Sequence, residues 1–127
     1  MTVRTYRDLN VWQKSMDLIE EIYRITASFP RDEQFGITSQ IRRSAVSVTA
    51  NVAEGFGRGS RRDYARFVSI ALGSARELEA LLLVCVRIGT VTSQELSKCN
   101  SLIDEISRML YSLRRRLLEP GNEVSKP

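Results

Sequence analysis

Apolar residues recur along this chain every three to four positions, which is the spacing of helical turns. No segment shows the sustained alternation of a half-buried strand. Four segments follow the helical period, at about residues 8–28, 37–55, 60–88 and 92–119. Pro30, the glycine turn at 55–60, Gly89 and Pro120-Gly121 separate or end these segments.

Short connections between consecutive helices place neighbouring helices antiparallel. The sequence therefore predicts an all-α, antiparallel up-down-up-down four-helix bundle. A length of 127 residues fits one such domain. We expect the bundle to occupy residues 1–120 and residues 121–127 to form a flexible tail.

Two predicted helices carry more apolar surface than one core-facing side requires. Residues 81–86 are apolar all round, and the first helix has two apolar rows. Each helix of a bundle also has an outer face, so the excess implies a second covering surface, most simply another copy of the chain. The sequence predicts a homo-oligomer. The two rows are Leu9, Trp12, Met16, Ile19 and Tyr23, and Leu18, Ile22, Ile25 and Phe29.

Positive charge is concentrated between residues 40 and 66. This window holds six arginines against two carboxylates, an excess of four that equals the formal net charge of the whole chain. Sixteen of the 19 basic residues are arginine, whose planar guanidinium suits phosphate and carboxylate. Codon usage in a GC-rich genome would give the same bias.

The glycine turn and the start of the third helix carry most of this charge. We call Arg58, Arg61, Arg62 and Arg66 the arginine corner; Arg43, on the preceding helix, is a further candidate contact. Exposed amides and guanidiniums at a helix start can hold phosphate oxygens, so the corner is a candidate site for RNA or DNA backbone. The alternative is a solvated turn, because the glycine spacing does not match a nucleotide-binding loop and no strand precedes it.

A row of polar residues at helical spacing follows the second helix beside its apolar row. Short polar side chains suit close packing in which each finds a partner, which favours a structural, subunit-linking role. A solvated face and the lining of a small-ligand site are the alternatives. The row, called the polar seam here, is Gln40, Ser44, Ser47, Asn51 and Glu54.

Catalysis and metal binding have little support in the residue types present. The chain has no histidine, so a bundle di-iron site, a Ser-His-Asp set and a Cys-His set are excluded. Cys85 and Cys99 lie in apolar helical patterns and are expected to be packed free thiols. The sequence predicts a protein that is not an enzyme and that has no cofactor and no metal.

Targeting signals are also missing from the pattern. No apolar run follows a basic start, so no signal peptide is expected. The longest nearly uncharged apolar stretch, residues 80–88, is far shorter than the roughly 20 residues of a membrane span. We expect a cytoplasmic protein without a membrane partner.

Several short motifs along residues 6–118 resemble one known family. The motifs are Arg7-Asp8-Leu9 with Val11-Trp12-Gln13-Lys14, Phe29-Pro30 with residues 36–45, Ser47 with residues 51–58, and residues 71–74 with Glu77-Leu78-Glu79. The most specific block is residues 51–58. The chain thus resembles the four-helix-bundle family named after proteins encoded in intervening sequences of bacterial 23S ribosomal RNA genes; accessory proteins of diversity-generating retroelements are similar.

The resemblance implies a bacterial four-helix bundle assembled as a homopentamer, with a link to RNA or other nucleic acid, but it brings no established activity. One departure is Thr49, where members of the family often have proline, so the second helix is expected to be straighter here. The leading hypothesis is a non-enzymatic oligomeric bundle that binds RNA or DNA backbone through the arginine corner. The alternative is a structural adaptor that binds another protein without nucleic acid.

Overall fold

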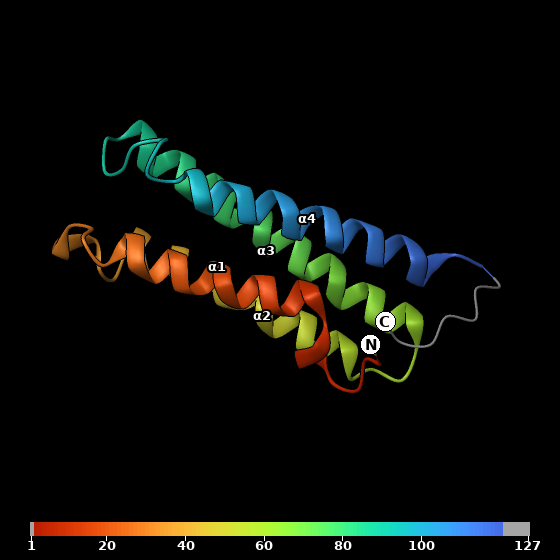
Figure 1. Cartoon of the computed structure of the whole chain (residues 1–127). Helices are drawn as coiled ribbons and strands as arrows, with labels where there is room; N and C mark the ends of the chain where they lie inside the picture. Colours follow the sequence, from red (N-terminus) through yellow and green to blue (C-terminus); the bar gives the residue numbers. More distant parts are fainter. Residues whose placement is uncertain (1, 121–127) are drawn as a thin grey trace.

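The computed structural model describes residues 2–120, and its elements are four α-helices and two short 3-10 helices (Figure 1). No strand is present in this part of the chain, so the predicted all-α four-helix bundle is confirmed. The predicted tail, residues 121–127, lies outside the described residues. The elements are η1 (Tyr6–Asp8), α1 (Asn10–Thr26), η2 (Arg31–Glu33), α2 (Ile37–Phe56), α3 (Arg61–Arg87) and α4 (Ser97–Leu118).

Side-chain hydrogen bonds mark the start of α3 and lie just before α1 and α4. Thr5 and Asp8 form a reciprocal capping box around η1, and regular α1 starts at Asn10. Ser60 accepts a hydrogen bond from the backbone N–H of Asp63 at the start of α3. The sequence also predicts a capping box of Thr92 and Glu95; these residues bond each other's backbone, but regular α4 begins later, at Ser97.

The core follows the predicted apolar rows of α2 and α4. On α2, Ile41, Ala45, Val48 and Val52 are fully buried. On α4 the whole predicted row is buried, from Leu96 to Leu117. Both cysteines are buried free thiols, and burial raises the pKa of Cys99 to about 12. None of the described helices is long and apolar enough to cross a membrane.

On α3 the helical spacing predicts a core row of Phe67, Ala71, Ser74, Leu78, Leu81, Cys85 and Ile88. The prediction was wrong at the two ends of this row, since Phe67 is only partly buried and Ile88 is 59% exposed, whereas Tyr64 and Leu82 are buried. Between the ends, Ala71, Ser74, Leu78 and Cys85 are buried, and Ile88 lies beyond the last residue of the helix, Arg87.

Apolar side chains remain on the outside of the single chain. In α1, Leu18, Ile22 and Ile25 face the core, and the other predicted row lies outward with Met16 38% and Tyr23 44% exposed. In the all-apolar run of α3, Leu82 and Cys85 are buried, and Leu83 and Val84 are exposed. The chain alone therefore does not cover all of its helical apolar surface. That a second copy covers it stays a prediction at this point.

Gly73 lies in the middle of α3, where glycine costs about 1 kcal/mol relative to alanine. A Cβ at this position would meet no other atom within 4 Å. Nothing within the described chain therefore requires a glycine here.

Gly55 has the opposite environment, because α3 crosses closely over the end of α2. A Cβ added to Gly55 would lie 2.9 Å from the Cβ of Phe67 and 3.0 Å from the Cδ1 of Tyr64. We expect Gly55→Ala to lower the free energy of unfolding by about 1–3 kcal/mol through overpacking. Urea denaturation followed by circular dichroism measures this loss. The matched control is Gly59→Ala, which has open space around the new methyl group and should unfold like the wild type.

Candidate nucleic-acid interface

The arginine corner lies at one end of the bundle. The α2–α3 turn, the start of α1 and the C-terminal end of α4 share this end, and η2 and the α3–α4 connection lie at the other (Figure 1). Contact between the corner and α4 is direct, because the Arg61 guanidinium donates a hydrogen bond to the backbone carbonyl of Arg116. Residues 55 positions apart in the sequence thus form one surface.

Arg61 has a structural role in this arrangement. The last carbonyls of a helix lack partners within the helix, and a guanidinium near them also suits the negative end of the helix dipole. The Arg61 side chain is partly buried, and its Nε has no hydrogen-bond partner in the described chain. Arg61 therefore caps α4, and most of its hydrogen-bonding capacity is turned inward.

Arg58 and Arg66 are held by a shared set of partners. Arg58 donates to Glu54 at 2.6 Å and lies 3.7 Å from Asp63, while Arg66 donates to Asp63 at 3.0 Å. Both guanidiniums also lie over the ring of Phe67, at 4.5 and 4.4 Å from its centroid. The corner is thus ordered by its own carboxylates and one aromatic ring.

Arg62 is exposed, as is Arg66, but Arg62 forms no hydrogen bond or ion pair with any described residue. Together with Arg66 it lines an open hollow of about 500 Å³ between α3 and the end of α4. Arg43 does not join the corner. It lies on the exposed surface of α2, about 20 Å along the helix axis from Arg58 at 1.5 Å per residue.

The structure adds a second group of arginines that sequence reasoning missed, Arg114, Arg115 and Arg116, which we call the α4 arginine run. The Arg114 guanidinium donates to the Ser69 hydroxyl on α3 at 3.3 Å, so this run borders the corner. Arg116, with Arg108, also lines a hollow of about 530 Å³ against the start of α1. Three consecutive arginines are a visible signal in the sequence, but only the packing of α4 on α3 brings them to the corner.

The polar seam is divided between the interior and the surface. Ser44 is buried, and the Ser47 hydroxyl bonds that of Ser74 on α3 at 2.8 Å. The Asn51 amide donates to the Ser47 carbonyl at 2.8 Å. The middle of the seam therefore packs against α3 of the same chain. Gln40 and Glu54 are exposed, and for them a role in linking subunits stays a prediction.

Tyr64 lies beneath the corner with its hydroxyl buried and without a hydrogen-bond partner in the described chain. Burial raises the pKa of Tyr64 to about 12, although the nearby charge of Arg116 lowers it. An unsatisfied buried hydroxyl destabilises the folded state. The tyrosine ring is therefore a packing element of the corner, and its hydroxyl adds no stability.

We expect Tyr64→Phe to raise the free energy of unfolding by about 1 kcal/mol, since the substitution removes an unpaired polar atom and keeps the ring. Urea denaturation measures the change. The control is Tyr23→Phe, because the Tyr23 ring is 44% exposed and should show little effect. A clear loss of stability in Tyr64→Phe would show that the hydroxyl has a partner.

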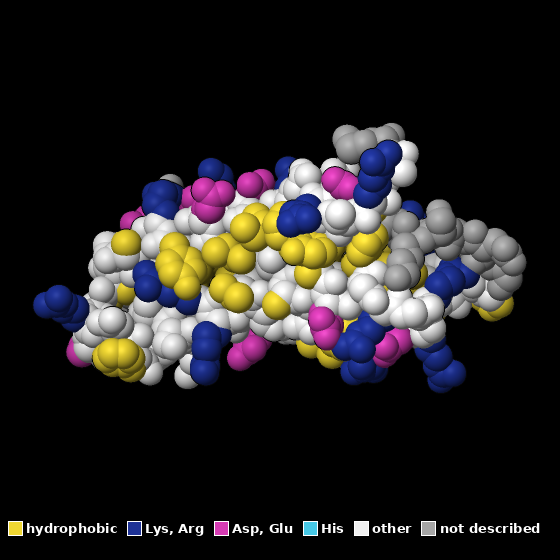
Figure 2. All heavy atoms as spheres, turned by 90° about the horizontal axis from the view of Figure 1, so that it is seen from below, with side chains coloured by type: hydrophobic (Ala, Val, Ile, Leu, Met, Phe, Trp, Pro, Cys, Tyr) yellow, Lys and Arg dark blue, Asp and Glu magenta, His cyan; other side chains and the backbone are white. Residues whose placement is uncertain are grey.

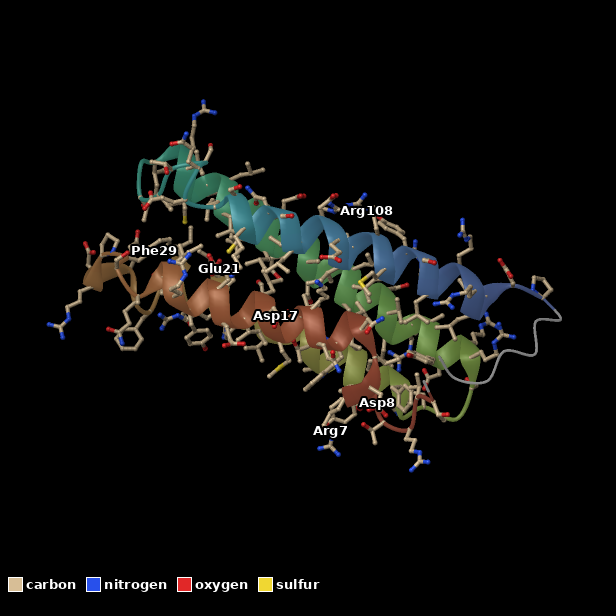
Figure 3. All side chains as sticks on the ribbon, in the orientation of Figure 1. Arg7, Asp8, Asp17, Glu21, Phe29 and Arg108 are labelled. Atoms are coloured by element: carbon tan, nitrogen blue, oxygen red, sulfur yellow. The ribbon has the colours of Figure 1, made fainter. Side chains whose placement is uncertain are left out.

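Two further hollows toward the other end lie between α1 and α4, with volumes of about 730 and 750 Å³. Figure 3 places Glu21 and Phe29 toward that end of α1, and Arg7 and Asp8 at the arginine end. Glu21 is only 4% exposed, and Arg24 donates two hydrogen bonds to it. These bonds outweigh burial and lower the pKa of Glu21, with a smaller effect from Lys98. The carboxylate of Glu21 is thus fully engaged in its ion pair with Arg24.

Glu21→Gln should lower the free energy of unfolding at neutral pH by about 1–2 kcal/mol, because charge-assisted hydrogen bonds are lost. The pKa of Glu21 is lower in the folded state than in the unfolded chain, so its contribution is present above the unfolded pKa. It is lost as the pH falls through the folded pKa. Urea midpoints at neutral and acid pH should show the variant and the wild type converging in acid. Glu20→Gln, an exposed neighbour, is the control.

Within residues 2–120, no group of three or more His, Cys, Asp or Glu side chains is placed to hold a metal ion. The described chain contains no histidine that would act as a general base. The feature that distinguishes this surface is its positive charge.

Comparison with known proteins identifies the family of the chain. The family described as 23S rRNA-intervening sequence protein matches residues 7–112. The chain belongs to this family. A solved structure from Bacteroides thetaiotaomicron, a protein of unknown function from the S23 ribosomal protein family, is 29% identical with a TM-score of 0.74. The similarity covers 83% of this chain and 98% of that chain. Among curated proteins, none matches.

Proposed function

We propose that this protein is a non-enzymatic homo-oligomer that binds RNA or DNA backbone at the arginine end of the bundle. The observation that carries this proposal is the charge at that end. The arginine corner and the α4 arginine run contribute seven arginines, and the carboxylates within the same two segments, residues 54–66 and 114–119, are Glu54, Asp63 and Glu119, which leaves an excess of four positive charges.

The contacts are electrostatic and largely independent of base sequence, because phosphate contacts position a nucleic acid and only base contacts specify it. Arg62 and Arg115 are exposed and without ion pairs to described residues, so they meet phosphates first. Arg66 is paired with Asp63 on the surface, and an exposed pair of this kind exchanges easily for a phosphate. Arg61 takes no direct part, since it caps α4.

RNA is the ligand to test first. The family of the chain is named after 23S rRNA, and the Bacteroides relative belongs to a family named after a ribosomal protein. The homopentamer implied by the resemblance is the assembly we expect in a bacterial cytoplasm. Repeating one cationic end on every subunit lets weak contacts add through avidity.

The second candidate is an adaptor that binds another protein. The exposed apolar side chains of α1 and α3 support it, because such surface on a soluble protein marks an interaction site. The salt dependence of binding distinguishes the two candidate functions. Binding to nucleic acid weakens steeply as salt rises, since counterions are released from the phosphates, and apolar contacts do not weaken in this way.

Arg62→Gln/Arg115→Gln should weaken binding to single-stranded poly(U) and reduce the slope of log affinity against log salt by about 1.4, or 0.7 per phosphate contact. Neither side chain contacts a described residue through a hydrogen bond or ion pair, so helicity should be unchanged. Fluorescence anisotropy across a salt series measures both effects.

The matched control is Arg31→Gln/Arg87→Gln. It removes the same charge from exposed positions, on η2 and at the end of α3, away from the corner. Equal losses in the two double variants would mean that only net charge matters. Undiminished poly(U) binding in the Arg62/Arg115 variant would refute the arginine end as the binding site.

A further inference from the structure

The outer face of α1 and α2 carries a continuous apolar surface. Figure 2 shows a stripe of hydrophobic side chains along this face, bordered by charged residues. Met16, Tyr23 and Val46 are 38%, 44% and 42% exposed. We call the set Trp12, Met16, Ile19, Tyr23 and Val46 the α1–α2 ridge, because its members are large and lie at successive helical turns.

The outer face of α3 has the complementary shape. Ile70, Gly73, Glu77, Ala80 and Val84, here the α3 strip, recur at steps of three and four residues and therefore lie along one side of the helix. All five are exposed. Gly73 has open space around it and no role within the chain, so the middle of the strip is a shallow place where another helix can approach closely.

The charged residues of the ridge and the strip are also complementary. On α2, Arg43 lies in the same row as Val46, at the border of the ridge, and Glu77 is the one charged residue of the strip. Both side chains are exposed, and neither forms an ion pair with any residue of the described chain. An arginine without a partner on one apolar face and a carboxylate without a partner on another can pair between two copies.

The α1–α2 ridge and the α3 strip also have similar lengths. At 1.5 Å per residue the ridge from Trp12 to Tyr23 is about 17 Å long and the strip from Ile70 to Val84 about 21 Å. A nucleic acid would not cover an apolar ridge, because its surface there is charged phosphate. The chain itself carries both halves of a matched contact.

We propose that the α1–α2 ridge of one copy packs against the α3 strip of the next copy, with Arg43 of the first opposite Glu77 of the second. The inference rests on the homo-oligomer of the proposed function and names its interface. Because the two faces differ, the contact is head-to-tail, and in the closed homo-oligomer of the proposed function its repetition forms a ring. In such a ring every copy presents its arginine end on the same side, so one RNA strand reaches several corners.

Gly73→Leu tests the interface. Leucine favours helix, and the site has room for it within one chain, so the fold should be kept while the neighbouring copy is blocked. By light scattering, the mass should fall from that of the oligomer to that of a single chain, 14.4 kDa. The control is Ser101→Leu on the exposed side of α4, which should keep the oligomeric mass. A wild-type chain that is itself monomeric, or a Gly73→Leu variant with the wild-type mass, overturns the proposal.

A charge exchange provides a second test that does not depend on Gly73. Arg43→Glu and Glu77→Arg should each reduce assembly, since each places like charges across the contact. Combining Arg43→Glu with Glu77→Arg in one chain should restore assembly, because every contact of the ring then places a glutamate at position 43 opposite an arginine at position 77. Failure of the double variant to recover the oligomeric mass overturns the pairing.

Binding assays with long poly(U) and with a short oligouridylate distinguish a defect in this interface from a defect in the arginine site. Monomeric Gly73→Leu should bind the short oligouridylate like the wild type and should bind long poly(U) about 100-fold more weakly, through lost avidity. Loss of binding to the short probe in Arg62→Gln/Arg115→Gln, with the mass unchanged, supports the arginine site alone. The two proposals can therefore fail independently.

Discussion

The end of α2 and the start of α3 lie in such close contact that there is no room for a side chain at Gly55, and the geometry of the arginine end follows from this contact. Tyr64 and Phe67 fill the space that the glycine leaves. Further along, small hydroxyl side chains continue the close approach, as in the bond between Ser47 and Ser74. A short, tightly packed connection leaves the turn little freedom, so the side chains that follow it are held in fixed directions.

Concentrating arginines at one end of a small bundle creates repulsion that the structure offsets locally. Asp63 lies between Arg58 and Arg66, and the C-terminal carbonyl of α4 receives Arg61. These contacts neutralise part of the charge and leave Arg62 and Arg115 exposed and without ion pairs to described residues. The surface therefore combines fixed cations that maintain the fold with free cations that are available to a polyanion.

Periodicity predicted the fold well, since apolar rows on α2 and α4 depend only on local spacing. It failed only at the two ends of the row on α3, because Ile88 lies past the end of the helix and Phe67 lies beside Gly55 at the edge of the contact with α2. The corner was visible in the sequence as a cluster of arginines. The different roles of these arginines were not visible in the sequence, because the capping of α4 by Arg61 depends on a backbone carbonyl far away in the chain. The α4 arginine run was missed for the same reason, and the polar seam turned partly inward because its partner, Ser74, lies on another helix.

The ring of Phe67 lies beneath two guanidiniums, and this contact affects how fast an anion binds and dissociates. Side chains that already rest on a flat surface have given up most of their rotational freedom, so capture of an anion requires little further ordering. At Arg66, moreover, an arriving phosphate replaces the carboxylate oxygen of Asp63 and not bulk solvent. The free energies of the two ion pairs are similar, so the exchange gains little. In the proposed function each contact with a phosphate would therefore be brief, and a strand would pass from one subunit of the proposed oligomer to the next without dissociating from the oligomer.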